Sequence, residues 1–149
     1  MGKLISVIVN CNDGEKYLEK CISSSLSQTY KNFEIIFFDN FSLDNSKKII
    51  RNFNDKRIKY YYSGTKLTLY DARNKAIEKT SGELIAFLDV DDWWDKNYLS
   101  SREYVFNNEE IDFFYSNAFI YYEKSKKLKK YKNKILPDGK IYKFLAKDY

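Results

Sequence analysis

Four short apolar runs, each ending abruptly at polar residues, set the architecture expected of this chain. They occupy residues 5–9, 33–38, 58–62 and 84–88 and are rich in β-branched and aromatic side chains. A continuous run of this length and composition is typical of a strand that is buried on both faces. Such strands belong to parallel sheets whose two faces are covered by helices.

Between and after these runs, apolar residues recur at three-to-four-residue spacing, the pattern of amphipathic helices. Helices are predicted over residues 15–27, 42–53, 67–80 and 96–106. The third is expected to end near Gly82, where a C-terminal glycine fits. Two aromatic-rich runs, residues 111–115 and 118–122, are interpreted as further strands. Alternating strands and helices predict the α/β class, with right-handed crossovers between parallel strands.

The length and composition limit the chemistry and the location of the chain. With 149 residues it fits a single domain, and it contains no histidine, which excludes Ser-His-Asp and Cys-His catalysis and zinc sites with histidine ligands. No apolar run reaches the ~18 residues of a membrane span. Two cysteines, Cys11 and Cys21, imply no disulfide framework and are interpreted as small packing residues. We therefore expect a cytoplasmic protein.

The positive charge is concentrated in one segment. Of the 26 basic residues, seven are lysines between positions 124 and 134, and the remaining 19 face 21 acidic residues, while the whole chain carries +5. One interpretation is a solvated hairpin or loop. The other is attraction to a phosphate-rich partner such as anionic lipid or nucleic acid. Composition does not choose between them.

Ligands of open α/β sheets bind beyond the carboxyl ends of the strands. At the end of the fourth run, Asp89, Asp91 and Asp92 stand within four residues. Carboxylates that repel one another favour a divalent cation, and oxygen ligands suit Mg²⁺ or Mn²⁺ bound together with substrate phosphates. The alternative is that one carboxylate caps a following helix while the others are solvated.

These strand ends carry motifs that resemble the family 2 glycosyltransferases, closely over residues 4–99 and loosely beyond. The motifs, in chain order, are SVIVNCND at 6–13, YL at 17–18, SLSQTY at 25–30, FEII at 33–36, DNFS at 39–42, ARN at 72–74 and GELIAFLDVDD at 82–92. The resemblance implies the GT-A fold, a Rossmann-like, mainly parallel sheet flanked by helices. It predicts one nucleotide-sugar-binding domain over residues 1–149, with a donor-binding core at 1–99 and a partial acceptor-side segment at 100–149.

The resemblance also implies a reaction, the transfer of a sugar from a nucleotide-diphosphate donor to an acceptor hydroxyl with inversion. Asp89 and Asp91 would form the Asp-x-Asp motif that binds Mg²⁺ or Mn²⁺, with Asp89 also near the ribose. Asp92 is interpreted as a helix cap. The other residues expected to bind the donor are Asn10, Asn12, Asp39, Asn40 and Arg73.

The chain departs from the family pattern at two of these places. The usual Pro-Thr-Tyr-Asn stretch is replaced at residues 10–13, which removes a tyrosine that would stack on the base. The usual second aspartate after the second strand is Asn40. Each asparagine could instead satisfy its own turn, and Arg73 could instead pair with Asp71 or Glu78. Trp93 and Trp94 could stack on a sugar or cover the end of the sheet.

In the family this chain resembles, an acidic pair supplies the general base. No acidic pair of this sequence stands in a similar sequence context, so the catalytic base is unassigned. Residues 139–145 resemble the beginning of the acceptor-side segment, so we expect a donor half truncated before the acceptor half. The alternative is a catalytically silent nucleotide-sugar-binding domain. Expected partners are a nucleotide-sugar donor, a glycan or lipid-linked acceptor in polysaccharide biosynthesis and an anionic membrane at the inner face, but not nucleic acid.

Overall fold

The computed structural model describes residues 2–108, 111, 114–116 and 118–131. The chain divides into two compact units, Met1–Glu109 and Glu110–Tyr149, and each is described here by itself. The grouping of residues 1–149 into a single domain stays a prediction.

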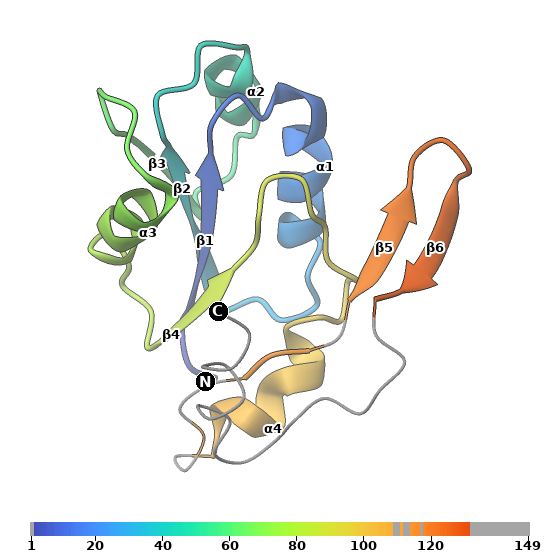
Figure 1. The fold of residues 1–149 in the computed structure, drawn as a ribbon. Helices are drawn as coiled ribbons and strands as arrows, with labels where there is room; N and C mark the ends of the chain where they lie inside the picture. Colours follow the sequence, from blue (N-terminus) through green and yellow to red (C-terminus); the bar gives the residue numbers. More distant parts are fainter. Residues whose placement is uncertain (1, 109–110, 112–113, 117, 132–149) are drawn as a thin grey trace, which may run out of the picture. The chain divides into compact units, whose positions relative to one another are not determined.

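A four-stranded parallel sheet forms the centre of the first unit (Figure 1). Its strands are β1 (Ile5–Cys11), β2 (Phe33–Asp39), β3 (Ile58–Tyr62) and β4 (Leu84–Phe87), in the order β3-β2-β1-β4. All three neighbouring pairs are parallel. The structure therefore confirms the predicted α/β class and the four predicted strands, with shifts of one or two residues at some ends. Burial on both faces holds for β1 and β2 only, since β3 and β4 are partly exposed.

Helices cover both faces of this sheet (Figure 1). The helices α1 (Glu15–Leu26) and α2 (Ser46–Asn52) pack on one face, where Val7, Val9 and Phe37 are fully buried. The helix α3 (Leu69–Ile77) packs on the other. Burial on both faces explains why β1 and β2 are apolar without interruption over most of their length.

Small side chains bring α3 close to the sheet. Ala72 and Ala76 are fully buried one turn apart and contact Ile8, Ile36 and Phe38. Because an alanine methyl adds little bulk, the helix backbone approaches the strands closely, and α3 is held beside the carboxyl ends of β1 and β2.

The helix α3 is shorter than predicted and does not end at a glycine. Its last residue is Ile77, and Glu78 forms the C-terminal cap in a helical conformation. Gly82 is required for a different reason. A Cβ atom at this position would lie 2.6 Å from the Ser6 amide nitrogen and 2.7 Å from the Leu4 carbonyl oxygen, so only glycine fits against β1.

The predicted helix over 96–106 is wrong in its first part. The structure has a short 3-10 helix, η1 (Ser100–Arg102), followed by one turn of α-helix, α4 (Glu103–Phe106). The buried Gln28 side chain accepts a hydrogen bond from the Leu99 amide (2.9 Å) and donates one to the Asp95 carbonyl (2.7 Å). These long-range bonds hold residues 95–99 in turns, against their helical periodicity.

The second unit contains an antiparallel hairpin of β5 (Phe119–Tyr122) and β6 (Lys127–Lys130). This confirms a strand in the run at 118–122, and the described part of the lysine segment forms the turn and the second strand of the hairpin. In the predicted strand at 111–115, residues 111, 114 and 115 are not in a strand, and 112–113 lie outside the described residues. Residues 139–145 lie outside them as well.

The structure shows the surroundings of the two cysteines. Cys11 and Cys21 are free and buried, which confirms them as packing residues. Burial raises the pKa of both thiols, so neither is suited to act as a nucleophile.

Within the described residues, no helix combines the length and apolar character needed to cross a bilayer.

A buried carboxylate ties the amino ends of the strands together. Glu34 of β2 is 6% exposed and accepts hydrogen bonds from the Ser6 hydroxyl (2.6 Å) and the Ser81 amide (2.6 Å), and it pairs with Lys59. Burial alone would raise the pKa of Glu34, but these donors outweigh it and hold the pKa below its usual 4.5.

We predict that Glu34→Gln lowers the free energy of unfolding at pH 7 by about 1.5–3 kcal/mol, the range for hydrogen bonds to a charged group. Because the folded state holds the pKa of Glu34 low, its stabilisation is present above pH 4.5 and is lost as the pH falls through the folded value. Urea unfolding of both proteins from pH 7 to pH 3 should show the difference shrinking below about pH 4.5. A difference that does not change with pH would contradict the ionic origin.

Candidate donor-binding edge

The parallel register places the predicted site residues at one edge of the sheet. Cys11 of β1 lies opposite Asp39 of β2, and the last β1–β4 pair is Ile8 with Phe87. Asn10 and Asp89 each stand two residues beyond that last pair. Residues far apart in sequence therefore meet at the carboxyl ends of three adjacent strands, which we call the donor-binding edge.

Hydrogen bonds join the loops that follow β1 and β2. The Asn40 amide donates to the Cys11 carbonyl (2.7 Å), and the Asn12 side chain donates to the carbonyls of Asn40 (3.1 Å) and Phe41 (3.4 Å). Asp13 accepts a hydrogen bond from the Leu43 amide (2.7 Å). The Asn12 side-chain nitrogen is thus bonded to backbone carbonyls of the second loop.

Both loops contain a non-glycine residue in the left-handed region. Asp13 has φ 55° and Phe41 has φ 64°. For Phe41 this conformation costs on the order of 1–2 kcal/mol, which the surrounding hydrogen bonds offset. The Phe41 ring stacks on Tyr62, with ring centroids 6.2 Å apart, and Tyr62 is 45% exposed at the end of β3. No local signal in the sequence marks this turn, so the pair is not among the predicted site residues.

Asp39 is fully buried and organises the edge from inside. One carboxylate oxygen accepts from the Ser42 amide (2.8 Å) and the other from the Tyr60 hydroxyl (2.7 Å). Burial, together with this hydrogen bond to a carboxylate, raises the pKa of Tyr60. Both oxygens of Asp39 are therefore bonded to other residues of the chain.

The Asn40 side chain makes a two-point contact with the loop before α3. Its nitrogen donates to the Leu67 carbonyl (3.0 Å), and its oxygen accepts from the Leu67 amide (2.9 Å). These two bonds use both the donor and the acceptor of the side-chain amide, and Asn40 is only 6% exposed. In this structure the side chain positions the start of α3, and its contact with a nucleotide stays a prediction.

Asn10 has an unusual environment for an amide. Both polar atoms of its side chain are buried, and neither has a hydrogen-bond partner among the described residues. Asn10 has the same strand parity as Ser6 and Ile8, so it lies on the α3 side of the sheet. Leaving such a group unpaired is costly, so it marks a place where a ligand or water would find a partner.

The acidic residues form an exposed turn directly after β4. The Asp92 amide donates to the Asp89 carbonyl (2.9 Å), and Asp89, Asp91 and Asp92 are all exposed. Partial desolvation and the negative charges of Asp91 and Asp89 raise the pKa of Asp92. Asp92 precedes no helix directly, because η1 begins at Ser100, so its interpretation as a helix cap is wrong.

Arg73 links α3 to this acidic turn. Its Nη2 atom lies 2.7 Å from Oδ1 of Asp89, with 31% of the arginine side chain and 56% of the aspartate side chain exposed. The alternative pairing with Asp71 is not seen, because the Asp71 carboxylate accepts a hydrogen bond from the Thr68 hydroxyl at the start of α3 (2.7 Å). The only cationic partner of Asp89 that the described residues show is therefore a side chain also able to bind phosphate.

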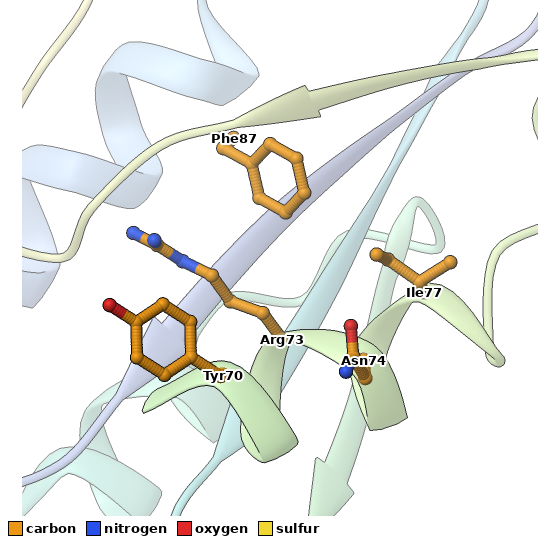
Figure 2. Close-up of a pocket in the computed structure, with 5 residues that line it drawn as sticks. All are labelled: Tyr70, Arg73, Asn74, Ile77 and Phe87. Carbon is orange, nitrogen blue, oxygen red and sulfur yellow. The ribbon is translucent and has the colours of Figure 1, made fainter. Parts of the chain in front are cut away.

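A hollow of about 340 Å³ lies beside this ion pair, between α3 and β4 (Figure 2). Figure 2 shows the Arg73 side chain extending between the rings of Tyr70 and Phe87. The guanidinium carbon is 5.7 Å from the centre of the Phe87 ring. The hollow is open, and its lining is mainly apolar apart from Arg73 and Asn74.

The two tryptophans after the acidic turn have different surroundings. Trp94 is half-buried and stacks on Tyr98, with ring centroids 4.3 Å apart, so it covers the end of the core. Trp93 is 37% exposed and lies beneath the Lys20 ammonium group, 3.0 Å from its ring centre. Trp94 therefore fits the structural interpretation, and the stacking of Trp93 on a sugar stays a prediction.

The acidic turn fits a cation that a substrate helps to coordinate. Among the described residues no three acidic or cysteine side chains converge to form a closed metal site. Asp91 is exposed, and desolvation together with the negative charges of its neighbours raises the pKa of Asp92, so a cation would relieve the repulsion within the turn. Mg²⁺ is commonly bound in this manner, through one or two carboxylates plus substrate phosphates.

Comparisons with known proteins find relatives in one family. The profile of Glycosyl transferase family 2 matches residues 6–148. Escherichia coli WfaP, a UDP-Glc:alpha-D-GlcNAc-diphosphoundecaprenol beta-1,3-glucosyltransferase by name, is 36% identical over 118 residues, which cover 79% of this chain and 47% of WfaP. Escherichia coli WfgD, named for the same activity, is 37% identical over 78% of this chain and 46% of its own length. The chain spans about half the length of these relatives.

Solved structures share the fold. S. aureus TarS 1-349, in complex with UDP, has a TM-score of 0.62 and 29% sequence identity over 65% of this chain and 30% of that chain. The mannosyltransferase PcManGT from Pyrobaculum calidifontis, in complex with GDP-Man and Mn²⁺, has a TM-score of 0.68 over 73% of this chain and 34% of its own. Its 18% identity makes it evidence for the fold alone.

We predict that Asn10→Leu raises the free energy of unfolding by about 1–2 kcal/mol, because an unsatisfied buried polar group costs about 1–3 kcal/mol. Asn12→Leu is the matched control and should lower stability, since it breaks two bonds to loop carbonyls. Chemical denaturation of the three proteins measures both effects. A loss of stability in Asn10→Leu would show that the Asn10 amide is already satisfied in the folded protein.

Proposed function

This chain belongs to glycosyl transferase family 2, an inverting family, and we propose that its donor-binding edge binds a nucleoside-diphosphate sugar for transfer to an acceptor hydroxyl. The observation that carries the proposal is the exposed acidic turn after β4, held by Arg73 beside the ends of β1 and β2. A structural ion pair alone would not require three adjacent carboxylates, whose repulsion is costly.

The proposed division of roles follows the order of the strands. Asn10, at the end of β1, offers the nucleoside an amide whose two functions are unpaired among the described residues. Asn12, Asp39 and Asn40 shape the adjoining loops through the hydrogen bonds described above. We propose that the partly exposed Asn12 contacts the base or ribose, while the buried Asp39 and Asn40 hold the loops against which the nucleoside lies. The names of WfaP and WfgD contain UDP-Glc, which supports a nucleotide-sugar donor.

The diphosphate is proposed to lie over the acidic turn. Arg73 would exchange part of its pairing with Asp89 for a phosphate, since guanidinium binds either group in the same planar geometry. Asp89 and Asp91 would hold Mg²⁺ or Mn²⁺, which when bound neutralises the charge that develops on the departing diphosphate. In this proposal the residues of the chain hold the donor at the donor-binding edge, where Arg73 and the acidic turn lie close together.

The acceptor is proposed to be a glycan or a lipid-linked saccharide in polysaccharide biosynthesis, as the diphosphoundecaprenol in the name of WfaP suggests. Such an acceptor would place the protein in the cytoplasm, at the inner membrane face. Inversion requires a general base for the acceptor hydroxyl. Asp39 does not suit this role, because it is fully buried with both oxygens hydrogen-bonded.

A second candidate function is binding of the nucleotide sugar without turnover. The observation that favours it is that no described acid of the edge is assigned as the base: Asp89, Asp91 and Asp92 form the acidic turn, Asp39 is buried, and Asp13 accepts a hydrogen bond from the Leu43 amide. Conversion of a nucleotide sugar into a glycoside by this 149-residue chain would exclude this candidate, whereas binding without turnover would support it.

We predict that one of UDP, GDP, TDP or CDP binds the chain in calorimetric titration and that Mn²⁺ strengthens the binding. Asp91→Asn should remove the dependence on Mn²⁺, and Arg73→Gln should weaken binding by about 10- to 100-fold, since hydrogen bonds to charged groups contribute about 1.5–3 kcal/mol. Asn10→Leu should weaken binding while the protein stays folded.

Glu78→Gln is the matched control, because it also removes one negative charge but lies at the exposed end of α3. Its binding should equal that of the wild type. If no nucleotide binds, the donor proposal fails. If a nucleotide binds with equal affinity to wild type and Asp91→Asn, with and without Mn²⁺, the proposed metal role fails while donor binding stands.

A further inference from the structure

The β5–β6 hairpin holds most of the net positive charge of the protein. Residues 119–131 contain five lysines and one glutamate, a net charge of +4 in a chain whose total is +5. All five lysines, at positions 124, 126, 127, 129 and 130, are exposed. None belongs to the donor-binding edge, so the proposed function leaves this charge without a role.

Large apolar side chains are exposed among these lysines. Phe119 is 66% exposed and Leu128 is 62% exposed. In the antiparallel register Phe119 lies opposite Lys130, and Leu128 opposite Tyr121, so Phe119 and Leu128 share one face of the hairpin. Isolated lysines on a surface need no explanation. Phe119 and Leu128, however, expose apolar area to water, which is unfavourable unless a partner covers it.

The backbone conformation of the turn between β5 and β6 is a second observation that favours a role for positive charge in this hairpin. Lys126 has φ 55°, in the left-handed region where glycine is preferred and a lysine costs on the order of 1 kcal/mol. The turn thus carries a lysine where glycine would be more stable, and it places this charge at the tip of the hairpin beside Lys124 and Lys127.

We propose that this hairpin is a membrane-binding element that lies on an anionic lipid surface. Lysines near such a surface gain from its negative potential, and the exposed Phe119 and Leu128 gain by entering the interface between headgroups and acyl chains. Nucleic acid would use the charge but offers no comparable environment for an aliphatic side chain such as Leu128. The inference goes beyond the proposed function and does not depend on donor binding.

The test is flotation of the 149-residue chain with phosphatidylcholine vesicles, with and without phosphatidylglycerol. We expect binding only to the anionic vesicles, and weaker binding as salt rises because charges are screened. Each lysine contributes about fivefold to partitioning. The triple variant Lys127→Glu, Lys129→Glu, Lys130→Glu should therefore bind at least about 100-fold more weakly. Leu128→Ser should weaken the binding that survives at high salt.

The matched control is Lys48→Glu, Lys56→Glu, Lys75→Glu, which changes the total charge equally on exposed residues of the first unit. It should lose much less affinity than the hairpin variant. Equal losses would show a general charge effect and overturn the proposal. Absence of binding by the wild type, or tighter binding to RNA than to anionic vesicles, would overturn it as well.

A direct readout is available because Cys11 and Cys21 are buried. An environment-sensitive fluorophore on Leu128→Cys should brighten with anionic vesicles, whereas one on Lys56→Cys should not. Brightening at both positions, or at neither, would contradict the assignment to the hairpin. Nucleotide titration of the hairpin variant should match the wild type, so failure of this inference and failure of the proposed function are distinguishable.

Discussion

The parallel pairing of β1 with strands on both sides is the interaction on which the described first unit depends. β1 pairs with β2 over seven residues and with β4 over four, and its apolar side chains are almost completely buried. Because both partners run in the same direction, the loops that leave the three strands emerge at one edge. Asn10, Asn40 and Asp89 lie at the same edge of the sheet for this reason. The packing of Ala72 and Ala76 on the sheet and the contact between Asn40 and Leu67 position α3, which presents Arg73 to the acidic turn.

Sequence reasoning worked where burial determines structure. The run at 33–38 corresponds to β2 except for one residue at its end, and every residue of β2 is buried. It failed over 96–106, where the helical period is overridden by bonds from the Gln28 side chain to the Asp95 carbonyl and the Leu99 amide. Such bonds join residues far apart in the chain, and no local pattern reveals them.

The same distinction holds at the candidate site. The sheet rule selected Asp39, Asn40 and Asp89 as edge residues, and the structure places them there. What each side chain bonds could not be read from the sequence. Asp39 turns inward to Tyr60, and Asn40 turns to Leu67. Both orientations depend on loops whose left-handed residues are not glycines, so the usual sequence signal for the turn is missing.

The contact between Asn40 and Leu67 has a consequence for how this protein can change. An amide can donate to a carbonyl and accept from an N–H at the same time, whereas a carboxylate only accepts. An aspartate at this position would keep the bond from the Leu67 amide but would turn an oxygen toward the Leu67 carbonyl, with mutual repulsion. The donor and the acceptor of the Asn40 side chain are thus both used in bonds to the loop before α3. Under the proposed donor binding, a substitution of residue 40 that altered the preference for a nucleobase would also disturb the loop before α3, the helix that carries Arg73.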